Sequence, residues 1–140
     1  MSAGIGVTHS EFNPSKTEPM RFLQVWLIPE TSGGEPRYET LSIDDSEKQG
    51  QIKLFLSSDG RDGSIQTRAK ANVYAATLNG DEVLKHDFGT VSKAWLQVAR
   101  ETVSLNNEPL VAGDGVAIEG GGTLVLSEGF DAEVLLFEMP

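Results

Sequence analysis

The sequence predicts an all-β fold. Apolar residues recur with period two in most segments, and clusters of Gly, Asn, Asp and Ser separate these segments. No segment combines a helical apolar stripe with good caps over three turns, so helix is expected to be minor. Many short strands joined by tight turns are typical of a barrel or a sandwich. The 140-residue chain contains no cysteine and is long enough to bury such a core without disulfides.

The first predicted strand covers residues 21–28. The alternation places an apolar set on each face, with Leu23, Val25 and Leu27 on one and Phe22 and Trp26 on the other. A strand of this composition is expected to be buried on at least one side.

Four more strands follow from the same alternation. Their apolar residues are two apart, at Ile52, Leu54 and Leu56, at Tyr74, Ala76 and Leu78, at Ala94, Leu96 and Val98, and at Val134 and Leu136. Turn-forming residues lie between them, at 57–63, 79–80, 106–107, 113–115 and 120–122. The acids in the first of these turns lack the ligand spacing of an EF-hand loop, and its glycines explain it as a turn.

A domain boundary is predicted near residue 40. The polar stretch from Pro29 to Pro36 contains proline and glycine and reads as a linker or a long crossing loop. Residues 1–40 then contain too few strands for an independent sheet. Their apolar side chains need a surface supplied by something else, either a protein partner or a second copy in a homodimer.

The charge balance excludes several classes of partner. The net charge of −10 arises from 21 acidic and 11 basic residues, with no basic block that could follow a phosphate backbone, so direct nucleic-acid binding is not expected. No apolar run approaches the roughly 20 residues that span a bilayer, and the first residues lack the features of a signal peptide. With the absence of cysteine, this composition predicts a cytoplasmic protein without a membrane partner.

His9 and Glu11 are the candidate metal ligands. Residues two apart on a strand point to the same side, which lets an imidazole and a carboxylate grip one ion, although two solvated polar residues would give the same pattern. The only other histidine is His86, which is most simply a solvated side chain beside charged neighbours. A centre with three histidines and one carboxylate therefore cannot be assembled from this polypeptide alone.

Several motifs resemble the pirin family of two-barrel cupins. They lie in order at residues 2–13 (SAGIGVTHSEFN), 23–27 (LQVWL), 36–39 (PRYE), 58–64 (SDGRDGS), 113–115 (GDG) and 133–140 (EVLLFEMP). The likeness covers essentially the whole chain and corresponds to the later part of a pirin. It implies a cupin-type double-stranded β-helix, a jelly-roll-like barrel, over residues 41–140, preceded in residues 1–40 by the last strands of an incomplete first barrel and a linker. Met1 then matches a position that is interior in pirins. An internal start, a split gene or a trimmed polypeptide could each produce this match.

The resemblance also implies roles for the candidate ligands. It places His9 as the third histidine ligand and Glu11 as the carboxylate ligand, and it finds no residue matching the first two histidines, which form a His-x-His pair in pirins. The implied cofactor is a divalent transition metal, iron foremost, with nickel, copper or manganese as alternatives. Some pirins are quercetin 2,3-dioxygenases, in which the ligand carboxylate takes the proton of the flavonol hydroxyl, so Glu11 is the catalytic candidate.

Three functional hypotheses follow from this incomplete ligand set. The first is a pirin-like cupin that is weak or inactive as a dioxygenase on its own, because it lacks the first metal-binding segment. In the second, a second polypeptide supplies the missing His-x-His strands and restores turnover of a flavonol-like substrate. The third is a regulatory or interaction module that acts through a protein partner or a homodimer, as other pirins do with transcription factors.

Overall fold

The computed structural model describes residues 1–91 and 93–139. Within this part, the first regular element is the one-turn helix α1 (Asp45–Lys48), and a 3₁₀ turn covers Arg61–Gly63. The strands are β1 (Lys53–Ser57), β2 (Ile65–Gln66), β3 (Asn72–Gly80), β4 (Leu84–Asp87), β5 (Lys93–Leu105), β6 (Glu108–Val111), β7 (Gly115–Glu119) and β8 (Thr123–Glu138). The all-β class with minor helix is confirmed. No helix of the described residues has the length and apolar character needed to cross a bilayer.

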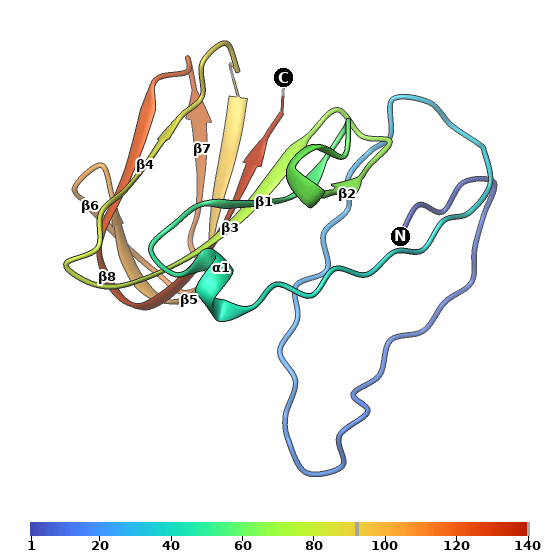
Figure 1. Cartoon of the computed structure of the whole chain (residues 1–140), viewed down its shortest axis with the longest axis horizontal. Coiled ribbons are helices and arrows are strands. Elements are labelled where there is room, and N and C mark those ends of the chain that lie inside the picture. Colours follow the sequence, from blue (N-terminus) through green and yellow to red (C-terminus); the bar gives the residue numbers. More distant parts are fainter. Residues whose placement is uncertain (92, 140) are drawn as a thin grey trace.

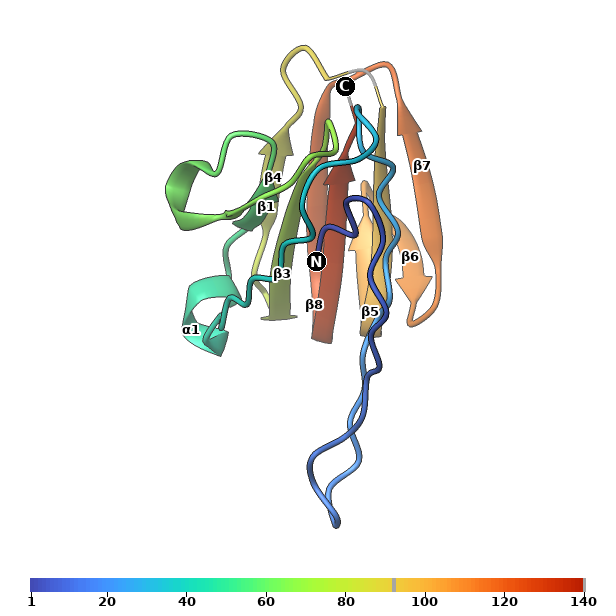
Figure 2. The ribbon, with the colours of Figure 1, turned by 90° about the vertical axis from the view of Figure 1, so that its right-hand side faces the viewer.

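The strands belong to one sheet that folds back on itself into two layers (Figures 1 and 2). One layer joins β2, β1 and β3 to the second half of β8, the first half of β5 and then β7. The other layer joins β4 to the first half of β8, the second half of β5 and then β6. The two longest strands, β5 and β8, therefore run through both layers and connect them.

The two long strands bend where they pass between the layers. The pairing of β5 with β8 shifts register three times between Val98 and Ser104. Glu101 in β5 has a φ of 52°, and Glu128 and Asp131 in β8 have φ values of 53° and 43°. Such irregularities bend a strand and increase its twist, which lets each of these strands serve both layers.

The core fills the space between the layers. Leu78, Leu96, Leu124 and Leu126 are at most 1% exposed. The strands predicted around Leu78, Leu96 and Val134 are confirmed, with their alternate residues pointing into this core. The strand predicted over 52–56 is also confirmed as β1, but a register shift between Leu54 and Leu56 breaks its alternation.

The turn between β5 and β6 has the geometry that its sequence predicts. Leu105 faces Glu108 across the hairpin, so Asn106 and Asn107 form a two-residue loop. Their φ values are 50° and 70°. A two-residue hairpin loop with positive φ at both positions is the type I′ turn, for which asparagine is well suited.

Residues 1–44, here called the N-terminal arm, extend outside the barrel as a long loop (Figures 1 and 2). The prediction of a strand over 21–28 is not met, because this segment joins no ladder, and most of its side chains are exposed, with Trp26 at 86% and Ile28 at 89%. An alternating sequence becomes a strand only beside a partner that accepts its backbone hydrogen bonds, and the described residues offer none here.

The base of the arm is fixed to the barrel by Arg68, which lies between β2 and β3. Its guanidinium donates to the carbonyls of Gly33 at 3.0 Å and Glu35 at 2.9 Å. Gly34 lies against the same guanidinium, since a Cβ at this position would come within 2.8 Å of Arg68 Nη1. The arm is therefore anchored at residues 33–35.

Candidate functional site

His9 and Glu11 lie close together on the arm. His9 Nε2 is 3.7 Å from Glu11 Oε1, and the two side chains are 41% and 47% exposed. The sequence prediction placed both residues on a strand, but the segment that carries them is irregular. The structure nevertheless brings the imidazole and the carboxylate to the same side, where both face solvent.

The distance between His9 Nε2 and Glu11 Oε1 is close to the spacing of two ligands of one metal ion. Two ligands at about 2.1 Å from an ion lie about 3.0 to 3.4 Å apart in octahedral or tetrahedral geometry. The observed 3.7 Å is a few tenths of an ångström longer, which a small side-chain rotation closes. Imidazole nitrogen and carboxylate oxygen also suit iron, nickel, copper and manganese. The pair therefore fits as part of a metal site.

The remaining ligands of such a site do not come from the described part of the chain. There, no group of three or more His, Cys, Asp or Glu side chains is arranged to hold a metal ion. Two protein ligands leave a divalent ion largely coordinated by water and therefore weakly held.

A second cluster of polar side chains lies inside the barrel around Glu138, whose side chain is only 6% exposed. Its Oε2 accepts hydrogen bonds from Asn72 Nδ2 at 2.8 Å and from the Tyr74 hydroxyl at 2.9 Å. Its Oε1 lies 2.8 Å from His86 Nε2. Asn72 and Tyr74 are on β3 and His86 is on β4, so the cluster connects the two layers of the barrel.

The cluster corrects the interpretation of His86 as a solvated residue, because its side chain is only 14% exposed. Its ring packs edge-on against Tyr74 and Phe88, with centroid distances of 4.8 Å and 5.2 Å. The sequence contains a signal for this burial, since Leu84, His86 and Phe88 alternate with charged residues. Its partner Glu138 lies 52 residues further along the chain, and only the fold brings the two together.

The surroundings of the cluster shift two pKa values. Burial acts to raise the pKa of Glu138, but the hydrogen bonds from His86, Asn72 and Tyr74 together outweigh it and hold the pKa below its usual range. Burial, followed by the hydrogen bond to the Glu138 carboxylate, raises the pKa of Tyr74 to about 12. At neutral pH the cluster therefore contains an ionised carboxylate and a protonated phenol.

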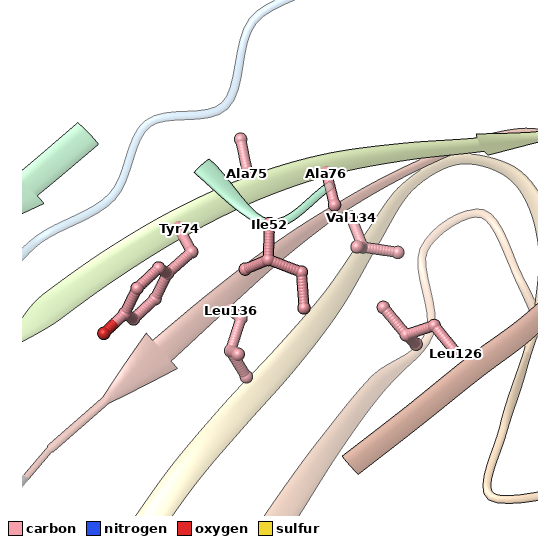
Figure 3. Close-up of a pocket in the computed structure, with 7 residues that line it drawn as sticks. All are labelled: Ile52, Tyr74, Ala75, Ala76, Leu126, Val134 and Leu136. Atoms are coloured by element: carbon pink, nitrogen blue, oxygen red, sulfur yellow. The ribbon is translucent and has the colours of Figure 1, made fainter. Parts of the chain in front are cut away.

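Two cavities adjoin Tyr74. The inner one lies between the layers, has no room for a water molecule and is lined by Ile52, Tyr74, Ala75, Ala76, Leu126, Val134 and Leu136 (Figure 3). Figure 3 shows the Tyr74 hydroxyl pointing away from these apolar side chains. The second cavity, here called the mouth pocket, has a volume of about 300 Å³ and lies beside β1 and the 3₁₀ turn.

Comparison with known proteins identifies the family. Residues 54–139 match the family model described as the quercetinase C-terminal cupin domain. The chain is 39% identical over 140 residues to a quercetin 2,3-dioxygenase of Escherichia coli, and the match includes 100% of this chain. This chain belongs to the pirin family of cupins. The resemblance and the cupin fold inferred from the sequence motifs are thereby confirmed.

Solved pirin structures share the architecture. YhhW from Escherichia coli superposes with a TM-score of 0.74 at 33% identity, over 82% of this chain and 48% of that chain. A second structure, described as bacterial pirin YhhW in complex with nickel(II), has a TM-score of 0.71 at 34% identity, over 80% of this chain and 47% of that chain. A metal ion is therefore bound by a relative of this chain.

The chain spans only part of these pirins. It covers 59% of the length of the E. coli quercetin 2,3-dioxygenase. It also covers 60% of a putative quercetin 2,3-dioxygenase of Pseudomonas aeruginosa, to which it is 33% identical with 99% of this chain aligned. Activities that belong to the whole relatives are therefore proposals for this chain.

Proposed function

We propose that His9 and Glu11 are half of a pirin-type metal site and that the remaining protein ligands come from outside these 140 residues. The observation that supports this role is the 3.7 Å approach of His9 Nε2 to Glu11 Oε1 on the exposed arm. The metal is a divalent transition ion, iron foremost, with nickel, copper or manganese as alternatives. As a 140-residue polypeptide, the protein then has weak or no quercetin 2,3-dioxygenase activity.

Each residue of the pair has a separate role in the complete site. His9 binds through a ring nitrogen and fixes the position of the ion relative to the arm. Glu11 binds through its carboxylate and accepts the proton of a flavonol hydroxyl as general base. The bound ion supplies Lewis-acid polarisation and a place for the substrate oxygen. Exposure of both side chains leaves them accessible to ligands from another segment.

A second role, in binding a protein partner or a second copy, is favoured by the apolar surface of the arm. Its exposed large apolar side chains are 41–89% exposed and include Phe12, Phe22, Trp26 and Ile28. An apolar surface of this kind marks an interaction site in a stable protein. Residues 1–40 then form the interaction module, and the barrel over residues 41–140 is its scaffold in a cytoplasmic protein.

Metal content per chain tests the metal role. Iron, nickel, copper and manganese are offered in turn, and bound metal is measured by mass spectrometry for the wild type, His9→Ala and Glu11→Gln. We expect sub-stoichiometric uptake that either substitution abolishes. Metal uptake at the wild-type level in both single variants would refute the assignment of His9 and Glu11 as ligands.

Complementation tests the origin of the missing ligands. Addition of a pirin fragment that contains the His-x-His strands should raise metal uptake toward one ion per chain and produce quercetin turnover. Glu11→Ala should abolish both. Robust turnover by the unsupplemented 140-residue chain would overturn the proposal of weak activity.

Light scattering and dye binding test the interaction role. A strict monomer in light scattering, with no exposed apolar surface detected by an apolar dye, would count against this role.

A further inference from the structure

The mouth pocket is separate from the His9 and Glu11 pair. It is lined by apolar, aromatic and charged groups, among them Ile52, Leu54, Tyr74, Arg61 and Asp62. Its volume of about 300 Å³ is at the lower end of the range for small-molecule sites, which suits a molecule of one or two rings.

The polar groups of the pocket have unused hydrogen-bonding capacity. The Asp62 carboxylate has no side-chain hydrogen bond or ion pair within the described ranges. Among the described residues, the exposed Arg61 bonds through Nη1 to Asp59 at 3.0 Å and to Asn72 at 3.3 Å, and it also interacts with the Tyr74 hydroxyl. A guanidinium carries five N–H donors, so donors at its other nitrogens remain for a ligand. The pocket thus offers both an acceptor and donors.

The aromatic wall of the pocket is held in place by the cluster around Glu138. The Tyr74 hydroxyl donates to Glu138 Oε2 at 2.9 Å, and Glu138 is also bonded to Asn72 and His86. These contacts connect both layers of the barrel and fix the ring before any ligand arrives. Such preorganisation lowers the entropic cost of binding.

The charges of the pocket disfavour an anion. The Lys53 ammonium is paired with Glu47 at 3.2 Å and Arg61 with Asp59 at 3.0 Å, which leaves the Asp62 carboxylate to accept a hydrogen bond from a neutral ligand. The apolar side chains of Ile52 and Leu54 add a surface that suits a flat hydrocarbon ring.

We propose that the mouth pocket of this barrel binds a small neutral hydroxylated aromatic molecule, without a metal. Tyr74 packs against the ring of the ligand, Asp62 accepts a hydrogen bond from a phenolic hydroxyl, and Arg61 donates to a ligand oxygen. This site depends on neither His9 nor Glu11, so it is independent of the proposed metal function.

Binding of catechol to the purified 140-residue chain tests the proposal. Titration is followed by amide chemical shifts in NMR spectra, in the presence of EDTA, with quercetin as a larger probe. Benzoate serves as an anionic control and cyclohexane-1,2-diol as a non-aromatic control. We expect saturable catechol binding, with shifts concentrated at residues 51–54, 61–62 and 74, and weaker binding of both controls.

Matched variants locate the site. Tyr74→Leu should weaken catechol binding by roughly 2- to 10-fold, whereas Tyr74→Phe, which keeps the ring but loses its bond to Glu138, should weaken binding less than Tyr74→Leu does. Asp62→Gly removes the acceptor at a position whose φ is 55°, where glycine is unstrained, and should weaken binding by about 3-fold or more. His9→Ala should bind catechol as tightly as the wild type.

Several results would overturn the proposal. These are the absence of saturable catechol binding, tighter binding of benzoate, shifts confined to the arm, or loss of binding in EDTA or in His9→Ala. Should Tyr74→Leu fail to fold, Asp62→Gly together with the wild-type shift map decides the question. Loss of metal uptake in His9→Ala with catechol binding unchanged would separate the two functions.

Discussion

Replacement of Glu138 by glutamine tests the idea that the buried cluster stabilises the barrel. The substitution keeps the shape of the side chain but removes the charge and one acceptor from a group bonded to Asn72, Tyr74 and His86. A hydrogen bond to a charged group contributes about 1.5–3 kcal/mol, against about 0.5–1.5 kcal/mol for a neutral one. In Glu138→Gln, one of the three hydrogen bonds of this side chain is lost and the other two become bonds to a neutral group. Removal of a buried charge offsets part of this loss, so the free energy of unfolding should fall by about 2–3 kcal/mol.

Urea denaturation followed by far-UV circular dichroism measures this effect at pH 7. The midpoint should fall while the m-value stays unchanged, because the substitution alters stability and not the surface exposed on unfolding. The control is Glu108→Gln on β6, an exposed side chain, which should change the free energy of unfolding by less than about 0.5 kcal/mol. A Glu138→Gln effect as small as that of the control would refute the reasoning.

The pH dependence of this effect has a defined direction. The folded-state pKa of Glu138 lies below its ordinary value of 4.5, so the carboxylate contributes stability that is fully present above that pH. This contribution is lost as the pH falls through the folded-state pKa. The difference between the wild type and Glu138→Gln should therefore narrow as the pH falls below 4.5. If the free energies of unfolding of the wild type and Glu138→Gln differ as much at pH 3.5 as at pH 7, the charge of the Glu138 carboxylate is not the cause of the difference.

Three further predictions concern the core, the arm and the long strands. Leu96→Ala creates a cavity at a fully buried position and should lower the free energy of unfolding by about 2–5 kcal/mol in the same urea assay. The control Val111→Ala, at a half-exposed site, should lower the free energy of unfolding by less than about 1 kcal/mol. Arg68→Gln removes two of the contacts that anchor the arm and leaves the bonds of Glu30 to the Arg68 carbonyl and of Arg37 to the Gln66 carbonyl. Limited proteolysis should therefore cleave the arm faster while the melting temperature of the barrel changes little; equal cleavage rates would contradict the anchoring role of the guanidinium. Gly129→Ala places a Cβ 2.6 Å from the Cβ of Leu78 and should destabilise the barrel by about 1–3 kcal/mol, and an unchanged midpoint would show that β3 and β8 can separate at little cost.

Parts of β1, β3, β5 and β8 could be predicted from the sequence because their apolar residues recur with period two, whereas β2, β4, β6 and β7, with two to five residues each, are too short for such a pattern to stand out. Leu78, Leu96 and Val134 alternate with polar or half-exposed neighbours, and period-two alternation is sufficient to assign a strand wherever the fold provides a partner. The segment around Trp26 shows equally good alternation but has no partner among the described residues, so it remains outside the sheet. Local pattern indicates what a segment can form, and the rest of the fold determines whether it does.

The two candidate sites differ in how far the sequence could lead. The proximity of His9 and Glu11 follows from their separation of two residues, and the structure agrees even without a strand. The cluster around Glu138 requires contacts between residues that are 52 to 66 positions apart, which no local pattern encodes. The sequence alone therefore could not reveal that His86 is buried against a carboxylate.

The passage of β5 and β8 through both layers has a consequence for local opening of the molecule. β3 and β4 are hydrogen-bonded directly to β8, and β6 and β7 are hydrogen-bonded directly to β5. β1 joins the sheet through β3, and β2 joins it through β1. Neither layer can lose one of these strands without disrupting the other layer as well. In native-state hydrogen exchange, the central amides of β5 and β8 should exchange only through global unfolding, whereas those of the short strand β2 should exchange through local fraying at much lower free energy.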